Sequence, residues 1–259
     1  MSATFAQYVA LGRRSILNTV RQPTAIVPSF LFPLIFLSIS SAAFERSTAL
    51  PGFPQVDSFL QFVIAATIVQ SALFGSISAG SAMATDIEGG FFERLIASPV
   101  SRMSILVGRL AGSATIGFFQ ALLYFGLTIL FGLTVEGGTL GIVAIATVSG
   151  VISAGIGSIA VALAIKTGSA EAVQGSFPML FAFLLLSSAF FPRALMNGWF
   201  KSAATLNPLS HLIESLRSIV IDGFSISKFL TALGIAGAIL MVGVILSSTL
   251  LRRRLGGRV

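Results

Sequence analysis

The sequence has no cysteine, a single histidine and few charged residues, and each scarcity excludes a class of protein. Without cysteine there is no disulfide, no thiol nucleophile and no cysteine-based metal site. Charged residues make up 10% of the chain, against about 25% in a typical soluble domain, so an ordinary soluble domain is excluded. A phosphate-binding loop is missing too, because Lys166-Thr167 lacks the glycines that should precede it. Any work that this protein performs therefore needs energy from another subunit.

Apolar residues, in contrast, are abundant and fall into long runs. They form 55% of the chain, its mean hydropathy is +0.96, and a run of about 20 such residues spans a bilayer as a helix. Glycines in the fourth run, including Gly150, Gly155 and Gly157, predict close approach of a neighbouring helix. The predicted fold is an all-α integral membrane protein, one transmembrane domain over residues 1–259 with six spans, at residues 24–44, 58–84, 103–133, 140–165, 172–191 and 229–251.

Residues 2–22 have apolar side chains at helical spacing, with Arg14 and Arg21 on the opposite side. A helix that is apolar on one face and basic on the other favours the membrane interface. The alternative is a simple extension of the first span at its cytoplasmic end.

The basic residues are distributed unequally between the two sides that six spans define. Eleven of the 16 Lys and Arg residues fall on the side of the termini and of residues 86–102, and five on the other. The positive-inside rule then places both termini in the cytoplasm. Arg252, Arg253 and Arg254 abut an apolar run, which favours a membrane stop signal over a nucleic-acid patch, so no nucleic-acid partner is expected.

A polar stretch, residues 86–102, separates the second and third spans. Gly89-Gly90 permits a sharp exit from the second span, and Ser98-Pro99 ends the short helix predicted over residues 88–97. This helix places Phe91 and Leu95 on one side, together with Phe92 and Ile96, beside exposed charges. Exposed aromatic residues next to charges suit the groove of a partner protein. An ordinary solvated loop is the alternative.

Residues 192–224, before the last span, are too polar to cross a membrane and too apolar for a solvated loop. Asn207 is a predicted N-cap, with Pro208 at the first helical position. The helix that follows carries an apolar stripe, with His211, Glu214 and Arg217 off it. We expect it to dip into the outer membrane surface, paired with a second short helix at residues 194–205. His211 near Glu214 is either a catalytic or metal-binding pair or the polar edge of this helix.

Several side chains inside the spans are candidates for a substrate path. They are Gln61, Gln70, Gln120, Tyr124 and, in the phenylalanine-rich fifth span, Phe181. Such a path without fixed charge favours a drug or lipid over a sugar or ion. The same phenylalanines also suit packing between helices or contact with lipid.

Two motifs resemble a known family. The first is Glu88-Gly-Gly-Phe-Phe-Glu-Arg-Leu-Ile-Ala-Ser-Pro-Val-Ser-Arg102, followed by Gly108-Arg109, and the second is Leu206-Asn-Pro-Leu-Ser-His-Leu-Ile-Glu-Ser-Leu-Arg217. Both are similar to the signatures of ABC-2 type permeases, most closely the daunorubicin-resistance type of drug and lipid exporter. Span number and motif order agree over nearly the whole chain.

The resemblance implies a non-catalytic permease subunit, paired with a second half of the same or a related chain and with cytoplasmic ATPase subunits that bind ATP and Mg. It exports a hydrophobic or amphiphilic drug or lipid across the plasma membrane of a bacterium, as in antibiotic resistance. Residues 2–22 resemble the connecting helix. By the same resemblance, the coupling helix that docks on the ATPase is expected to comprise Glu88, Phe91, Phe92, Glu93, Arg94, Leu95, Pro99 and Arg102. The outer re-entrant helices include Asn207, Pro208, Glu214 and Arg217.

Two rival functions require features that we do not find in the sequence. A secondary transporter or channel not coupled to ATP would show ionisable residues inside the membrane or an inverted repeat. A membrane-embedded transferase needs clustered acidic, His or Lys residues, which only His211, Glu214 and Arg217 approach.

Overall fold

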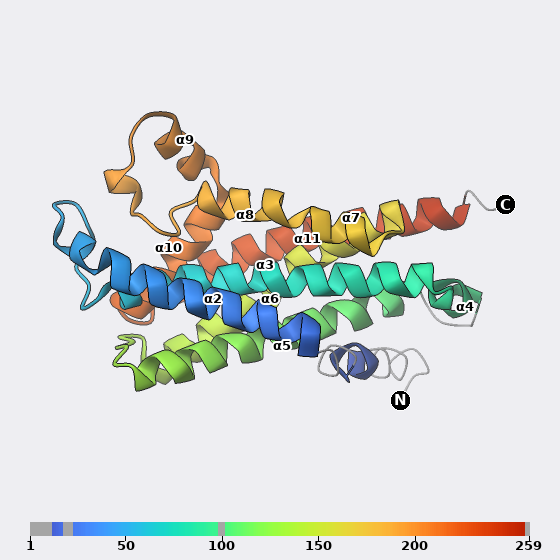
Figure 1. The fold of residues 1–259 in the computed structure, drawn as a ribbon, viewed down its shortest axis with the longest axis horizontal. Helices are drawn as coiled ribbons and strands as arrows, with labels where there is room; N and C mark the ends of the chain where they lie inside the picture. The colour runs from blue at the N-terminus through green and yellow to red at the C-terminus, as the bar shows by residue number, and fades with distance from the viewer. Residues whose placement is uncertain (1–11, 18–22, 98–101, 257–259) are drawn as a thin grey trace.

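The computed structural model describes residues 12–17, 23–97 and 102–256, and within these ranges every regular element is a helix (Figure 1). Five helices in the described chain are long and apolar enough to cross a membrane. They are α2 (Pro23–Phe44), α3 (Phe59–Glu88), α5 (Arg102–Leu130), α6 (Gly138–Thr167) and α11 (Ile226–Gly256). Each coincides with a predicted span, and α3 continues one turn beyond its predicted end.

The remaining predicted span, residues 172–191, is not one continuous helix. It consists of α7 (Ala170–Gly175) and α8 (Phe177–Leu185), which meet at Ser176. Pro178 lies in the first turn of α8, where its missing N–H is not needed, and so it favours a new helix start at that point. At 1.5 Å per residue the pair is about 24 Å long, short of the roughly 30 Å of a hydrocarbon core.

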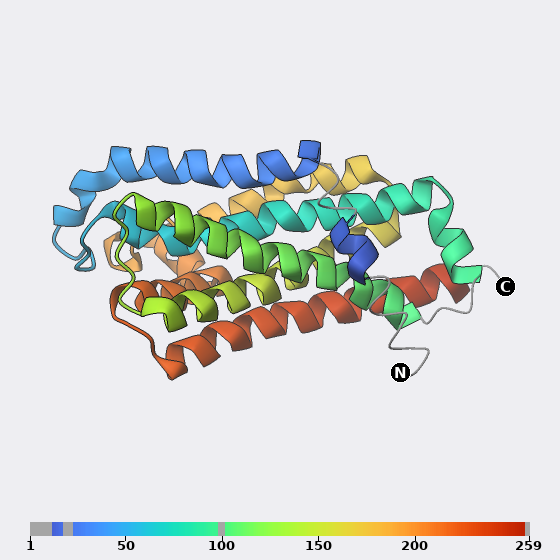
Figure 2. The same ribbon diagram turned by 90° about the horizontal axis from the view of Figure 1, so that it is seen from below.

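The long helices form an inner pair and an outer set (Figure 2). In their most apolar windows α3 and α6 are 72% and 83% buried, whereas α2 and α11 are 22% and 17% buried. α6 packs against α3, α5 and α11, and α2 packs mainly against α3. The apolar outer faces of α2 and α11 are therefore the ones available to lipid or to another chain.

Glycines set the closeness of this packing, as predicted for the fourth span. A Cβ added at Gly150 would lie 2.9 Å from the carbonyl oxygen of Ala114 in α5, and one at Gly155 would lie 3.0 Å from the backbone nitrogen of Leu240 in α11. Because these neighbours are backbone atoms, they cannot rotate away. The prediction of close approach at Gly150 and Gly155 is confirmed.

Gly150→Val is expected to lower the free energy of unfolding by about 1–3 kcal/mol, the usual cost of overpacking a tight core. Gly126→Val in α5 is the matched control, because nothing lies within 4 Å of a Cβ added there. Both variants gain the same β-branched side chain in a helix, so the difference between them reports packing. Thermal unfolding of the purified proteins in detergent measures it, and equal melting temperatures for the two variants would contradict the packing argument.

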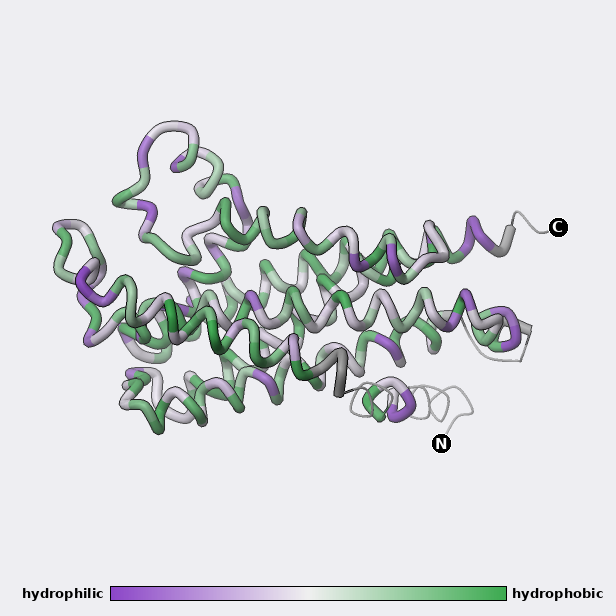
Figure 3. Tube along the Cα trace, in the orientation of Figure 1, coloured by the Kyte–Doolittle hydropathy of each residue, from purple (hydrophilic) through white to green (hydrophobic). Residues whose placement is uncertain are grey.

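Polar residues gather at the two ends of the bundle, and the middle is mainly hydrophobic (Figure 3). One end carries α4 (Phe91–Ala97), the helical residues 12–17 and the end of α11. The opposite end carries η1 (Glu45–Ala49), η2 (Arg193–Leu195), α9 (Gly198–Leu206) and α10 (Pro208–Ile221). The rest of the predicted 2–22 helix lies outside the described residues.

The N-cap predicted for α10 is confirmed, because the Asn207 side chain accepts a hydrogen bond from the Leu209 N–H at 2.9 Å, with Pro208 in the first turn. The burial of α10 differs from the prediction of a helix at the outer membrane surface. The apolar stripe of α10 packs against α3 and α11, and Arg217, expected on the polar side, is also buried. α10 is thus an integral part of the bundle core. The helix predicted at residues 194–205 is present as η2 and α9.

Candidate functional site

The helix predicted over residues 88–97 begins three residues later than expected. α3 continues through Glu88, Gly90 adopts a φ of +68° that favours glycine, and α4 starts at Phe91. The exposed Glu88 carboxylate accepts a hydrogen bond from the Ala170 N–H at 2.9 Å. Glu88 therefore joins the end of α3 to the start of α7.

Phe92 anchors α4 to its own bundle, whereas the sequence placed it on a surface for a partner. Its side chain is 2% exposed and packs in an apolar cluster with residues of α3, α5, α6 and α11. Part of the aromatic face of this short helix is therefore buried by packing within the permease itself and is not available to a partner. Leu95 packs against the same cluster and is half-buried.

The charged residues of α4 connect it to other elements. The Arg14 guanidinium lies 3.9 Å from the centre of the half-buried Phe91 ring. Glu93 pairs with Arg254 of α11 at 3.9 Å. Arg254 in turn donates a hydrogen bond to the Ile165 carbonyl at the end of α6, at 2.9 Å.

Of the remaining predicted docking residues, Arg94 has an exposed side chain whose Nε donates to the Gly90 carbonyl at 3.3 Å. Arg102 is the first residue of α5. The side chain of Arg102, and all of Pro99, lie outside the described part of the chain. Glu88 and Arg94 are therefore the predicted docking residues whose side chains are exposed in the described structure.

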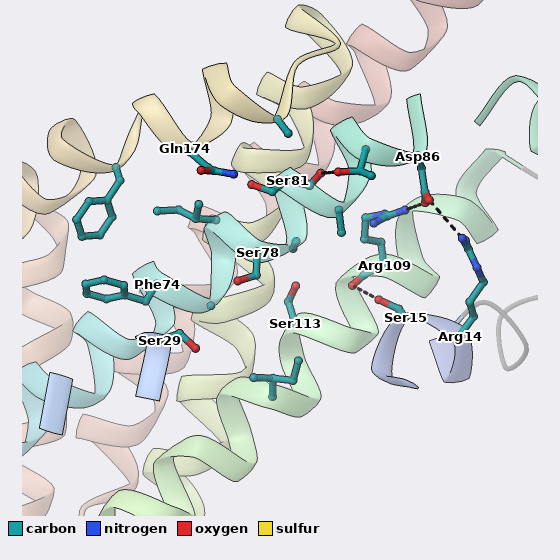
Figure 4. Close-up of a pocket in the computed structure, with 18 of the residues that line it drawn as sticks. Arg14, Ser15, Ser29, Phe74, Ser78, Ser81, Asp86, Arg109, Ser113 and Gln174 are labelled. Atoms are coloured by element: carbon teal, nitrogen blue, oxygen red, sulfur yellow. Dashed lines mark hydrogen bonds and ion pairs between the residues drawn. The ribbon is translucent and has the colours of Figure 1, made fainter. Parts of the chain in front are cut away.

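An ion-pair cluster lies beside α4, and the sequence analysis did not identify it (Figure 4). Asp86 accepts hydrogen bonds from both Arg109 of α5 and Arg14, the latter at 3.3 Å. Ser15 donates to the Arg109 carbonyl at 3.4 Å, and a Cβ at Gly112 would lie 2.3 Å from the Ser15 hydroxyl. The segment 12–17 is thus seated closely on α5. The signal available was an arginine inside an apolar run, which is costly unless paired.

Next to this cluster the structure contains a cavity of about 650 Å³ between residues 12–17, α2, α3, α4, α5, α7 and α8. Arg14, Asp86 and Arg109 line one end, and Phe74 and Phe177 line another part (Figure 4). The volume falls within the roughly 300–1,000 Å³ of small-molecule sites.

At the opposite end of the bundle Arg217 is 5% exposed. Its Nε donates to the Phe62 carbonyl at 2.8 Å, its Nη2 donates to the Ser188 and Ala189 carbonyls at 2.9 Å each, and its guanidinium lies 3.6 Å from the Phe62 ring centre. Burial lowers the pKa of Arg217 to about 9, against the opposing effect of the Glu214 carboxylate. Arg217 therefore remains a buried cation at neutral pH, held by carbonyl groups.

His211 and Glu214, the neighbours of Arg217 on α10, each contact a residue outside this helix. Glu214 pairs with Arg193 of η2, and the His211 Nε2 lies 2.9 Å from the Thr205 carbonyl oxygen. Among the described residues no group of three or more His, Asp or Glu side chains could hold a metal. These contacts suit the polar edge of α10, one of the two alternatives for this pair.

Comparison with known proteins decides the family. The model of the ABC-2 type transporter family matches residues 6–221. The chain belongs to this family. It is a multi-pass membrane permease, a transport subunit without catalytic activity, and permeases of this family typically pair with ATPase subunits. The resemblance found in the sequence is confirmed.

Named relatives are distant. The permease is 28% identical over 199 residues to the daunorubicin resistance ABC transporter permease protein DrrB1 of Streptomyces coeruleorubidus, covering 76% of this chain and 69% of that protein. It is 25% identical to the putative transport permease ycf38 of Porphyra purpurea, over 81% of this chain and 72% of the relative. The putative transport permease ycf38 of Cyanophora paradoxa is also 25% identical, over 80% and 71%.

The candidate path residues of the permease do not form one continuous lining. Gln61 lies at the α10 end, where its Nε2 donates to the Thr134 hydroxyl at 3.1 Å and its Oε1 accepts from the Asp57 N–H at 3.0 Å. It thus joins two loops. Gln70 is fully buried, and its amide has no hydrogen-bond partner in the described structure.

Gln120, Tyr124 and Phe181 lie nearer the cavity. The Gln120 amide donates to the Ser29 carbonyl at 2.9 Å and to the Tyr124 hydroxyl at 2.8 Å, and Ser29 lines the cavity. The Phe181 ring stacks 5.7 Å from that of Phe177, a cavity residue. Gln120 and Tyr124 are therefore separated from the cavity by Ser29, and Phe181 is separated from it by Phe177.

Proposed function

We propose that this permease is the membrane part of an ATP-driven exporter and that a separate cytoplasmic ATPase acts on it through α4. The supporting observation is the position of α4, which projects at one end of the bundle while its inward side chains contact several other elements (Figures 1 and 2). In this proposal ATP and Mg bind to the ATPase, and the permease supplies the surface on which it acts.

Movement of α4 has three routes into the membrane part. Phe92 transmits it to the apolar cluster, Phe91 to Arg14 and the segment 12–17, and Glu93 to Arg254 on α11. Because Phe92 is fully packed and interiors are dense, α4 moves with its neighbours. Arg94 and Glu88 provide exposed charge for the partner, and Pro99 and Arg102 remain docking residues proposed from the sequence alone.

The proposed orientation places α4 and both termini in the cytoplasm, because eleven of the 16 basic residues lie on that side. α9 and α10 then lie at the outer end of the bundle, and the membrane is the plasma membrane of a bacterium. α7 and α8 serve as a sixth crossing whose helical part is shorter than the hydrocarbon core. A second half, of the same or a related chain, covers part of the exposed apolar face of α2, where Leu31, Ile35 and Ile39 are 50–63% exposed.

The proposed substrate is a hydrophobic or amphiphilic molecule, a drug or a lipid. A cavity of about 650 Å³ with both charged and aromatic walls supports this class, and one relative is named for daunorubicin resistance. Transport without ATP is less well supported. Asp86 and Arg109 are ionisable groups in helices, but Asp86 is shared between two guanidiniums near the end of α3.

Arg94→Glu tests the docking proposal, and it is a cleaner probe than Phe91 or Glu93, which contact Arg14 and Arg254. Co-purification with the ATPase encoded beside the permease gene is expected to fall about tenfold or more, because charge reversal at an interface costs several kcal/mol. Stimulated ATP hydrolysis falls with it. Stability should change by no more than about 0.5 kcal/mol, as for other exposed positions.

Arg252→Glu is the matched control, an exposed arginine at the same end of the bundle on α11. It should retain the ATPase as well as the unmodified permease does. An Arg94→Glu permease that still holds its ATPase fully would exclude α4 as the docking element.

A further inference from the structure

The cavity beside Asp86 has an ionic end whose charges do not balance. Arg14, Asp86 and Arg109 are the charged residues that line the cavity, so the described lining has a net charge of +1. The Asp86 and Arg109 side chains are 18% and 13% exposed, and the Arg14 side chain is 35% exposed. Excess positive charge in a partly enclosed cleft attracts an anion. Each guanidinium has five N–H donors, and in the described structure Asp86 accepts from one nitrogen of each.

The wall next to this end contains hydroxyl groups without partners. The side-chain oxygens of Ser81 and Ser113 are buried, line the cavity and have no hydrogen-bond partner among the described residues. A buried polar group without a partner is unfavourable, so such groups are usually satisfied by a ligand or water. Both residues are seen between the ionic end and the aromatic end in Figure 4.

The other part of the cavity is aromatic. Phe74 of α3 and Phe177 of α8 both line it, and their ring centres are 4.6 Å apart. A free inorganic anion would gain nothing from this surface. An acyl chain or a fused ring system would gain, because burying apolar area contributes roughly 25 cal/mol per Å².

We propose that this cavity binds one amphiphile with a phosphate headgroup of net negative charge. The headgroup oxygens accept hydrogen bonds from Arg14 and Arg109, whose planar guanidiniums match phosphate geometry. Ser81 and Ser113 donate to the same headgroup, and the apolar part packs on Phe74 and Phe177. The inference rests on the proposed function, and it narrows the proposed substrate to an anionic amphiphile taken up from the leaflet on the α4 side.

The test measures lipid binding by the full-length permease, purified without an ATPase, in a nonionic detergent. Native mass spectrometry counts bound lipid after addition of phosphatidylglycerol, which is anionic, or of phosphatidylcholine, whose choline neutralises the phosphate. One phosphatidylglycerol per chain is expected, with about tenfold or greater preference over phosphatidylcholine. Arg14→Gln should weaken phosphatidylglycerol binding about tenfold, the effect of one charge-assisted hydrogen bond.

Arg13→Gln is the matched control, since it removes the same charge from the exposed adjacent residue, which does not line the cavity. Ser78→Phe fills the cavity and should abolish binding, and if it does not fold, the two arginine variants still decide. Equal binding of the two lipids, or equal loss in Arg13→Gln and Arg14→Gln, would overturn the proposal.

Inorganic phosphate distinguishes a headgroup site from a site for the free ion. Millimolar phosphate should not displace the lipid. Full displacement would show that the cavity binds a free phosphate ion, which would refute the proposal of an amphiphile site. Because no ATPase is present, lipid binding and ATPase docking can fail independently. Loss of ATPase retention in Arg94→Glu with normal lipid binding leaves this inference intact, and the reverse result leaves the docking proposal intact.

Discussion

Arg217→Met is expected to lower the free energy of unfolding by about 3–5 kcal/mol, because three buried carbonyl groups lose the donor that Arg217 supplies. Those carbonyls belong to Phe62 in α3 and to Ser188 and Ala189 after α8. Methionine has a similar length and keeps the apolar contact with the Phe62 ring, so the change reports mainly the lost hydrogen bonds and charge. The melting temperature of the purified permease in detergent, together with the folded fraction after solubilisation, measures the effect.

Arg217→Lys sharpens the same test. Lysine keeps the charge but lacks the planar fork that reaches carbonyls on two different elements, so it should restore less than half of the loss. Lys201→Met, at an exposed position of α9, controls for the removal of a positive charge at this end of the bundle. A melting temperature for Arg217→Met equal to that of Lys201→Met would show that the three carbonyls have other partners.

The long helices and their close contacts were predictable from local sequence. Long apolar runs predicted α2, α3, α5, α6 and α11 to within a few residues at most boundaries. This works because a helix in lipid makes all its backbone hydrogen bonds within itself. The N-cap at Asn207 followed from a two-residue signal, and the packing at Gly150 from side-chain size alone. Each depends on residues that are neighbours along the chain or on a property of one residue.

The features that differed depend on partners far away in the sequence. Arg217 appears polar on a helical wheel, and its burial follows from a carbonyl 155 residues away. Phe92 appears exposed on an isolated helix, and it is buried because α3, α5, α6 and α11 converge beside it. Spacing within one helix contains no information about either contact.

The Asp86 cluster shows the same limit at the candidate site. Arg109 lies 23 residues after Asp86, and Arg14 lies 72 residues before it. In the sequence Arg14 belonged to the basic face of residues 2–22 and Arg109 followed the first family motif, and neither role linked them to Asp86. Their shared carboxylate is visible only once the segment 12–17 is seated on α5.

Asp86→Asn is expected to lower the free energy of unfolding by about 3 kcal/mol and to release the segment 12–17 from the bundle. The amide has no charge to oppose Arg109, which is 13% exposed at the inner end of the cavity, and an uncompensated buried charge is strongly destabilising. Glu88→Gln, the loss of another carboxylate two residues later, is the control. Glu88 is exposed and makes one hydrogen bond to the Ala170 N–H, so its loss should cost about 1 kcal/mol or less.

The seating of the segment 12–17 can be measured separately from stability. A Cβ at Gly12 would lie 3.7 Å from the Ala111 Cβ, a separation that suits a disulfide. Because the chain has no cysteine, Gly12→Cys with Ala111→Cys creates the only pair of thiols. Rapid oxidation is expected in this background, with severalfold slower crosslinking when Asp86→Asn is added. Adding Arg109→Leu as well removes the orphaned cation, so stability should partly return while the contact between Arg14 and Asp86 stays lost and crosslinking stays slow. Recovery of both together would mean that the contact between Arg14 and Asp86 is not needed to hold this segment, and that the unpaired Arg109 charge had displaced it.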